Sequence, residues 1–319
     1  RDSSVTGVQT CALPIYFNGC STGGRQGMSE AQRYPADYDG IVAAAPAINW
    51  PKLMMQSVWG SAQMIAANNP VAPCKLAAAT AAAIASCDGI DGVKDGVIED
   101  PMRCAFDPKT LVGTSAGECG TITEADAAVI KKIVEGPPSW YGQPWGADMT
   151  ALAAARGTPL KAAPFAFTVD WIRFWLTQNP QFDASTLTSE QFQYFWTQSL
   201  EEFGGVIGTD NPDLSAFKAR GGKVLQSWGF AEPALNPLMG LKYYDSVKKT
   251  MGPGTTDFYR MFMIPGGFHC GGGAGITDVD TLTPLVNWVE RGVAPERIVG
   301  QRKVGGKVVR TRPLCVYPA

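Results

Sequence analysis

The chain has 319 residues, of which 45% are hydrophobic, and its 27 basic and 29 acidic residues leave a net charge of −2. This content can fill a sizeable core, and the length suggests roughly two domains. The near-neutral charge gives no reason to expect a nucleic acid or a membrane as a partner, and no apolar run approaches the roughly 20 residues of a transmembrane helix. Eight cysteines placed beside turns and motifs indicate disulfides, and therefore a secreted or periplasmic location.

The first fifteen residues show no hydrophobic periodicity and resemble a translated sequencing-adapter read. We therefore expect residues 1–15 to be non-native, with the natural sequence beginning near Tyr16 inside a longer protein. That truncation would explain why no signal peptide precedes a secreted domain. The alternative is an unusual natural N-terminus, and the source nucleotide read at these codons distinguishes the two.

The next predicted elements surround a serine. The apolar run at 14–17 predicts a short buried strand, and residues 28–34 predict a helix that Pro35 ends. Between them lies Gly19-Cys20-Ser21-Thr22-Gly23, and the order strand, Gly-x-Ser-x-Gly, helix is that of a nucleophile elbow. Such a turn exposes the Ser21 hydroxyl and aims the Thr22 N–H, at the helix start, at a developing oxyanion.

Glycine is expected at positions 19 and 23 because this turn brings the strand and helix backbones too close for side chains. The alternative is a Gly/Ser turn that only joins two elements and carries no chemistry.

Beyond the elbow, the run at 39–46 predicts a second parallel strand. Residues 51–217 then differ in character, with alanine-rich helical stretches, loops and most of the tryptophans. We interpret this region as a lid domain inserted into a catalytic domain that is made of residues 16–50 and 218–319. The second part of that catalytic domain is predicted to contain strands at 223–230 and 257–265, helices at 238–249 and 281–291, and a polar hairpin at 298–312.

A serine needs a base to act as a nucleophile, and the chain contains one histidine, His269. It follows the predicted strand at 257–265 in a glycine-rich loop, a place that suits a catalytic histidine, although a purely structural histidine is the alternative. Cys20 precedes Ser21 and Cys270 follows His269. A disulfide between these cysteines would hold the nucleophile and the base together.

The sequence Gly-Cys-Ser-Thr-Gly-Gly-Arg-Gln-Gly at 19–27 and the later His-Cys resemble the tannase/feruloyl esterase family of secreted α/β-hydrolases. The resemblance extends over residues 16–318 and includes Thr311-Arg312-Pro313-Leu314-Cys315. It implies an α/β-hydrolase fold whose N-terminal strands are missing from this chain, a Cys20–Cys270 disulfide, and a large inserted lid.

The lid sequence at 87–100 is rich in aspartate and glycine and is similar to the calcium loop of that family. Carboxylates spaced by glycines can surround a hard cation together with backbone carbonyls. The resemblance assigns as ligands the side chains of Asp88, Asp91 and Asp95 and the backbone carbonyls of Val93 and Val97. The Ca²⁺ would be structural, since the carboxylates repel one another without it, and no organic cofactor is implied. The alternative is a solvated Asp/Gly turn.

Further cysteines are also predicted to pair. Cys87 and Cys104 bracket the acidic loop and are expected to form one disulfide, and Cys74 and Cys119 are candidates for another. Cys315 is expected to be unpaired, because members of the family continue beyond this point to a partner cysteine.

The family carries an aspartate that orients the histidine after the strand predicted at 223–230. In this chain the matching position is Glu232, which is a departure from the family pattern. Some α/β-hydrolases do use a glutamate as the triad acid. The alternative is a surface glutamate, with Asp245 or another acid in this role.

The resemblance implies a serine ester hydrolase that acts on small esters of gallic, ferulic or related hydroxybenzoic acids through an acyl-enzyme. The ring-rich stretch at 164–175 would stack on the acid, with Arg173 as a further contact, unless these rings form the core of the lid. As a fragment the chain is expected to be inactive. Two other classes stay open, namely a non-catalytic calcium-stabilised binding domain and a serine peptidase. Neither the particular ester nor the oligomeric state follows from the sequence.

Overall fold

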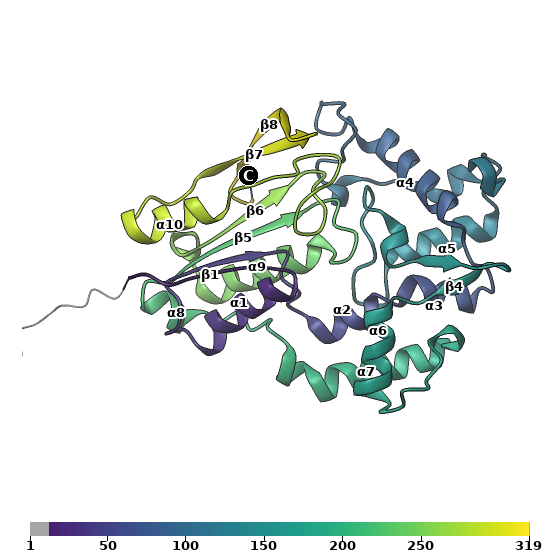
Figure 1. Cartoon of the computed structure of the whole chain (residues 1–319), viewed down its shortest axis with the longest axis horizontal. Coiled ribbons are helices and arrows are strands. Elements are labelled where there is room, and N and C mark those ends of the chain that lie inside the picture. The colour runs from purple at the N-terminus through teal and green to yellow at the C-terminus, as the bar shows by residue number, and fades with distance from the viewer. Residues whose placement is uncertain (1–12, 319) are drawn as a thin grey trace, which may run out of the picture.

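The fold is given by a computed structural model, which describes residues 13–318 (Figure 1). The predicted non-native segment at residues 1–15 lies almost entirely outside the described residues and stays a prediction. Among the described residues, no helix is both long enough and apolar enough to cross a membrane.

A four-stranded parallel sheet forms one half of the molecule. Its strands are in the order β1-β2-β5-β6 and their bounds are β1 Tyr16–Cys20, β2 Gly40–Ala44, β5 Lys223–Gly229 and β6 Tyr259–Ile264. The strands predicted at 39–46, 223–230 and 257–265 are therefore confirmed. The first strand was expected to be buried, and this is wrong: β1 is largely half-buried, because in the described part of the chain it pairs on one side only, with β2.

Helices cover both faces of this sheet (Figure 1). Because successive strand residues point to opposite faces, Ile41 and Val224 belong to one core cluster and Val42 and Leu225 to another. The first cluster is covered by α1, Thr22–Arg33, and α9, Pro237–Met251, and the second by α10, Leu282–Arg291. Because the four strands are parallel, their carboxyl ends all point in one direction, toward the other half of the molecule (Figure 1).

That other half is mostly helical and corresponds to the region between β2 and β5 (Figure 1). Its elements are α2 Trp50–Gln56, α3 Trp59–Ala66, α4 Pro73–Cys87, α5 Glu124–Glu135, β3 Ala154–Arg156, β4 Lys161–Ala163, α6 Ala166–Asp170, a π-helix at Trp171–Leu176, α7 Ser189–Ile207 and α8 Ser215–Ala219. Part of this region has its own apolar cluster, which includes Leu76, Ile130 and Trp145. The boundaries of the lid domain at 51 and 217 stay a prediction.

The sequence explains where several of these helices begin. Thr123 and Asp126 form a capping box at the start of α5, and Thr188 and Gln191 form another at the start of α7. Pro73 is placed at the first turn of α4, where its missing N–H costs nothing.

The chain ends in an antiparallel hairpin of β7, Arg297–Val304, and β8, Lys307–Cys315. The predicted hairpin around Gly305 and Gly306 is thereby confirmed. Both glycines have positive φ angles of 55° and 78°, which a two-residue turn of this kind requires.

Candidate active site

Ser21 lies in a strained turn between β1 and α1. Its backbone angles are φ 62° and ψ −119°, a region that side-chain-bearing residues rarely occupy. Its N–H donates to Ala44 O at 2.9 Å, and its carbonyl accepts from the N–H groups of Arg25 and Ala47. These bonds tie the turn both to the end of β2 and to the first turn of α1, so the strained conformation is held from two sides.

The glycines around this serine are needed for a reason that differs in part from the one expected. A Cβ atom on Gly19 would lie 2.5 Å from the carbonyl carbon of Gly23, which confirms close approach at position 19. A Cβ on Gly23 meets nothing within 4 Å, so that part of the prediction is wrong. The crowded helical position is Gly24, where a Cβ would lie 2.6 Å from Ala44 O. The helix α1 crosses the end of β2 at this position, and this crossing leaves no room for a side chain on Gly24.

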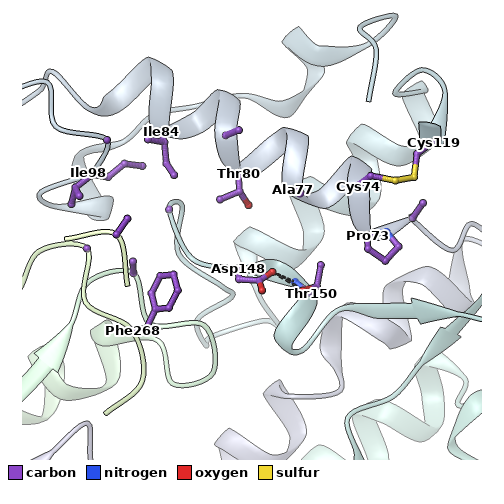
Figure 2. A pocket seen from close by; sticks show the side chains of 18 of the residues that line it. Pro73, Cys74, Ala77, Thr80, Ile84, Ile98, Cys119, Asp148, Thr150 and Phe268 are labelled. Atoms are coloured by element: carbon purple, nitrogen blue, oxygen red, sulfur yellow. Dashed lines mark hydrogen bonds between the residues drawn. A yellow bond between two sulfur atoms is a disulfide. The ribbon is translucent and has the colours of Figure 1, made fainter. Parts of the chain in front are cut away.

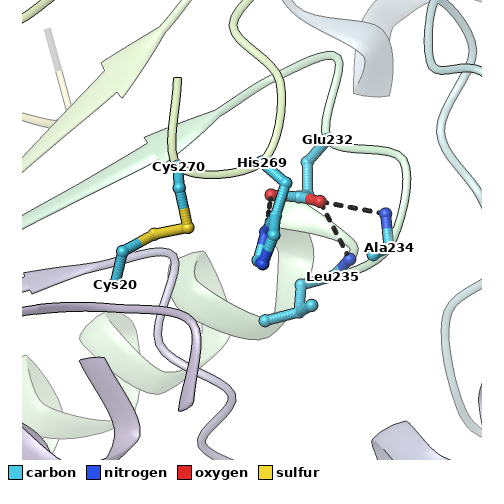
Figure 3. Close-up of a disulfide and its surroundings, with 6 residues drawn as sticks. All are labelled: Cys20, Glu232, Ala234, Leu235, His269 and Cys270. Atoms are coloured by element: carbon cyan, nitrogen blue, oxygen red, sulfur yellow. Dashed lines mark hydrogen bonds and ion pairs between the residues drawn. A yellow bond between two sulfur atoms is a disulfide. The ribbon is translucent and has the colours of Figure 1, made fainter. Parts of the chain in front are cut away.

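His269 and Glu232 meet at the carboxyl ends of β6 and β5 (Figure 3). The Nδ1 atom of His269 lies 2.8 Å from Oε2 of Glu232, whose side chain is fully buried. The other carboxylate oxygen, Oε1, accepts the N–H groups of Ala234 at 2.9 Å and Leu235 at 3.2 Å. Glu232 is thus not a surface residue, and the alternative acid Asp245 instead pairs with Lys248.

A disulfide joins the residue before Ser21 to the residue after His269. Cys20 and Cys270 are bonded across a sequence separation of 250 residues, with their Cα atoms 5.8 Å apart (Figure 3). Within the described part of the chain, Ser21 Oγ makes no hydrogen bond to the His269 ring. Catalytic hydrogen bonds are often long without substrate and shorten when the substrate is bound, and the disulfide keeps the two residues neighbours.

Thr22 is the first residue of α1. The first N–H groups of a helix have no acceptor within it, and the helix dipole favours negative charge at this end. The Thr22 N–H therefore lies beside Ser21 and has no partner inside the helix.

The other predicted disulfides are also formed. Cys87 pairs with Cys104, and Cys74 pairs with Cys119. Cys315 is exposed and makes no disulfide among the described residues.

Two arginines of β8 pair with three of the five acids in the loop at 88–100. Arg310 pairs with Asp95, and Arg312 pairs with Glu99 at 2.6 Å and with Asp91 at 3.6 Å. Asp88 Oδ1 accepts the N–H groups of the three residues at 95–97, each at 3.0 Å.

These contacts decide whether the loop fits a calcium ion as it stands. Among the described residues, no group of three acidic, histidine or cysteine side chains gathers as metal ligands do. Asp91 and Asp95 face guanidinium groups instead of each other, so they do not fit a metal site in this arrangement. No contact among the described residues tests whether the Val93 and Val97 carbonyls are ligands, and calcium binding stays a prediction.

Burial affects the acids of this loop differently. Burial raises the pKa of Glu99, and the neighbouring acids Asp91, Asp95 and Asp100 raise it further against the opposing effect of Arg312. For Asp88, burial alone would raise the pKa, but the three backbone N–H groups outweigh it and the pKa lies below its ordinary value.

A cavity of about 870 Å³ lies between α4 and the loop that carries Phe268 (Figure 2). It is lined mainly by apolar residues of α4, with Phe268 opposite them and Ala231 nearby. These last two residues are the immediate neighbours of His269 and Glu232, yet neither member of the pair lines the cavity, and nor does Ser21. Its polar wall includes Asp148, whose Oδ1 accepts both the N–H and the hydroxyl of Thr150.

The ring-rich stretch at 164–175 is only partly buried: Trp171 is 4% exposed, whereas Phe167, Phe174 and Trp175 are 68%, 56% and 51% exposed. Trp171 stacks on Trp175 with ring centroids 5.2 Å apart, and its Nε1 donates to Ser199 Oγ of α7. Arg173 Nε donates to Phe182 O, so its guanidinium serves a structural bond.

Sequence reasoning did not single out two amide side chains that contact the Glu232 turn, Gln143 and Asn236. Asn236 had a local signal, because an asparagine before Pro237 is typical of a helix N-cap. Gln143 lies in an irregular loop and had none.

Comparison with known proteins places this geometry in a family. The family model described as "Tannase and feruloyl esterase" matches residues 6–319. A probable feruloyl esterase from Arthroderma benhamiae is 43% identical over 324 residues, which are 95% of this chain and 60% of that protein. A mono(2-hydroxyethyl) terephthalate hydrolase from Piscinibacter sakaiensis is 32% identical, with 95% and 60% covered.

Solved structures agree with this assignment. The crystal structure of feruloyl esterase B from Aspergillus oryzae has a TM-score of 0.82 and 29% identity, covering 96% of this chain and 65% of that one. A tannin acyl hydrolase from Aspergillus niger, at 24% identity, shares the fold with a TM-score of 0.86 over 97% of this chain and 62% of its own. The chain belongs to the tannase and feruloyl esterase family, and it spans about 60% of the length of the curated relatives it matches.

Proposed function

We propose that the protein to which this chain belongs is a serine ester hydrolase that acts on esters of aromatic acids. The observation that carries the proposal is the contact of His269 Nδ1 with the buried carboxylate of Glu232, together with the disulfide that ties His269 to the strained Ser21 turn. The names of the relatives support the substrate class, since they are feruloyl esterases, a tannin acyl hydrolase and a terephthalate monoester hydrolase.

In this mechanism Ser21 attacks the ester carbonyl while His269 Nε2 accepts its hydroxyl proton. The Glu232 carboxylate orients the imidazole and stabilises its cation. The Thr22 N–H donates to the oxyanion, a contribution of about 3 kcal/mol for one such donor. His269 then protonates the departing alkoxide, and a water molecule attacks the acyl-enzyme with His269 again as the base.

Two further features belong to the proposal. The helical region between β2 and β5 acts as a lid over the carboxyl ends of the strands, because it packs at the end of the sheet where Ser21, Glu232 and His269 lie (Figure 1). The protein works outside the cytoplasm, since three disulfides persist only in an oxidising compartment.

The test compares hydrolysis of methyl esters of ferulic and gallic acid by Ser21→Ala and unmodified protein. Both are made as this chain alone and as this chain joined to the remaining segments of the Arthroderma relative. We expect at least one unmodified form to hydrolyse the esters and Ser21→Ala to lose that activity. Retained activity in Ser21→Ala, or no hydrolysis by either unmodified form, would overturn the proposal. Anilides of the same acids distinguish a peptidase, which would cleave them.

A further inference from the structure

Two buried amide side chains join the helical half of the molecule to the turn that carries Glu232. Gln143 Nε2, in the loop after α5, donates to Pro233 O at 2.8 Å. In the opposite direction, Asn236 Nδ2 donates to Gly142 O at 2.6 Å. The exposed fractions are only 3% for Gln143 and 6% for Asn236. The loop and the turn thus hold each other by reciprocal hydrogen bonds.

We propose that Gln143 and Asn236 are positioning residues that keep the Glu232 carboxylate where it binds His269. Their catalytic meaning rests on the proposed function, but their effect on the Glu232–His269 contact does not.

The turn needs such support because its own bonds are local. The N–H groups of Ala234 and Leu235 fix the carboxylate relative to the turn, but they do not fix the turn relative to the histidine loop. On one side the turn is attached to that loop by the bond from Ala231 N–H to Gly267 O, at 3.1 Å. Trp228 Nε1 also donates to Leu235 O at 3.0 Å and holds the turn against β5. On the side that faces the helical half, Gln143 and Asn236 attach the turn to the loop after α5.

Both amides are themselves held in place. The backbone N–H of Gln143 donates to Ile133 O of α5 at 3.0 Å, and its Nε2 also lies 3.4 Å from Asp148 O. The Oδ1 atom of Asn236 accepts the Leu238 N–H at 2.8 Å and so caps α9. Removing the Asn236 amide leaves the carbonyl of the buried Gly142 unsatisfied, and removing the Gln143 amide takes the donor from the carbonyl of the half-buried Pro233. The turn can recover that bond only by moving, and it would carry Glu232 with it.

The single histidine of the chain provides a direct readout. In protein labelled with ¹⁵N-histidine, the Nδ1–H proton that His269 shares with Glu232 gives one low-field resonance, whose exchange rate with water reports the strength of that contact. The variants are Gln143→Met, which keeps side-chain length without a donor, and Asn236→Ser, which keeps a helix cap but is too short to reach Gly142 O. The control is Gln198→Leu, because Gln198 Nε2 donates to Leu176 O inside the helical half, away from the turn.

We expect Gln143→Met and Asn236→Ser each to speed the exchange of this proton by about three- to tenfold, which is the effect that the loss of one hydrogen bond allows. The control should leave the exchange unchanged. In the form that hydrolyses esters, kcat should fall by about 10- to 100-fold with KM within about twofold.

A purely structural role predicts a different result, in which the melting temperature falls while the His269 resonance and its exchange rate stay as in the unmodified protein. That result would overturn the inference. If Gln143→Met does not fold, Asn236→Ser decides alone. If instead the proposed esterase function is wrong, the unmodified protein will be inactive while its His269 resonance is intact.

Discussion

Two buried carboxylates of this molecule are satisfied in different ways. Glu232, in the turn after β5, receives two backbone N–H groups, and within residues 13–318 its one side-chain partner is a histidine. Asp126, at the start of α5, faces Lys75 at 2.6 Å and also accepts from Thr123 and Asn69. Both side chains are almost completely buried.

The difference indicates what each carboxylate does. The charge of Asp126 is neutralised by a permanent cation and four hydrogen bonds, which is a structural arrangement. In the proposed mechanism, the negative charge of Glu232 is balanced when His269 takes up a proton. The two carboxylates are therefore equally buried but have different kinds of partner, a permanent cation for Asp126 and a histidine for Glu232.

The largest expected effect is on catalysis at Glu232. Glu232→Gln keeps an acceptor for the Ala234 and Leu235 N–H groups but removes the negative charge and favours the wrong histidine tautomer. We expect kcat to fall by about 10⁴-fold with little change in stability, measured with an aromatic ester. Glu201→Gln, on an exposed part of α7, is the control. A loss below tenfold would show that another acid acts on His269.

The second effect tests what holds His269 beside Ser21. Replacing Cys20 and Cys270 together by serine should lower the free energy of unfolding by about 5 kcal/mol, because a 250-residue loop is no longer closed in the unfolded chain. Denaturant unfolding measures this loss, and kcat should fall with it. Unchanged kcat would show that the hydrogen bonds of Glu232 alone position the histidine.

The third effect is the counterpart of the first. Asp126→Asn leaves Lys75, whose side chain is 15% exposed, without its partner and should cost about 3 kcal/mol of stability while kcat stays unchanged. Urea unfolding and an ester assay on the same preparation separate the two quantities. A parallel fall of kcat at full folding would contradict the structural role.

The same carboxylate predicts a pH dependence. Burial alone would raise the pKa of Asp126, but its bonds to Lys75, Thr123 and Asn69 outweigh burial, and the pKa lies below the ordinary 3.8. A carboxylate with a lowered pKa stabilises the fold above its ordinary pKa and loses that contribution as the pH falls through the lowered value. The stability difference between the unmodified protein and Asp126→Asn should therefore be constant at neutral pH and shrink below about pH 4.

The smallest effect concerns a third acid, Asp95, whose cation Arg310 is more exposed than Lys75. Arg310→Gln should cost about 1.5 kcal/mol, and Lys307→Gln at the exposed hairpin turn should cost nothing measurable. Because Asp95 is then free of its arginine, added calcium should raise the melting temperature of Arg310→Gln more than that of the unmodified protein. Equal responses would count against a cation at this loop.

These residues also show how far the sequence could predict the molecule. The elbow at Ser21 is a local pattern and was predicted from the sequence. The capping box of Thr123 and Asp126 is equally local, but it was not predicted. Identification of His269 was possible because it is the only histidine. Glu232 could be assigned only through the family resemblance, as the position that matches the family's aspartate after the strand at 223–230, since its partner lies 37 residues away.

Contacts between distant segments could not be predicted in this way. Arg310 is 215 residues from Asp95, and Gln143 is 90 residues from Pro233, with no spacing or periodicity to connect them. The exposure of β1 was missed because an apolar run does not tell a central strand from an edge strand. The crowding at Gly24 was missed because it depends on the angle at which α1 crosses β2.

The Cys20–Cys270 disulfide has a consequence for a protein exposed to proteases. Nearly all of the helical half lies between these two cysteines in the sequence, and so does the Glu232 turn. A single cut in any exposed loop of that interval leaves two polypeptides that remain one covalent molecule, with Ser21 and His269 still joined through the disulfide. A nicked preparation should therefore migrate as a single species until it is reduced.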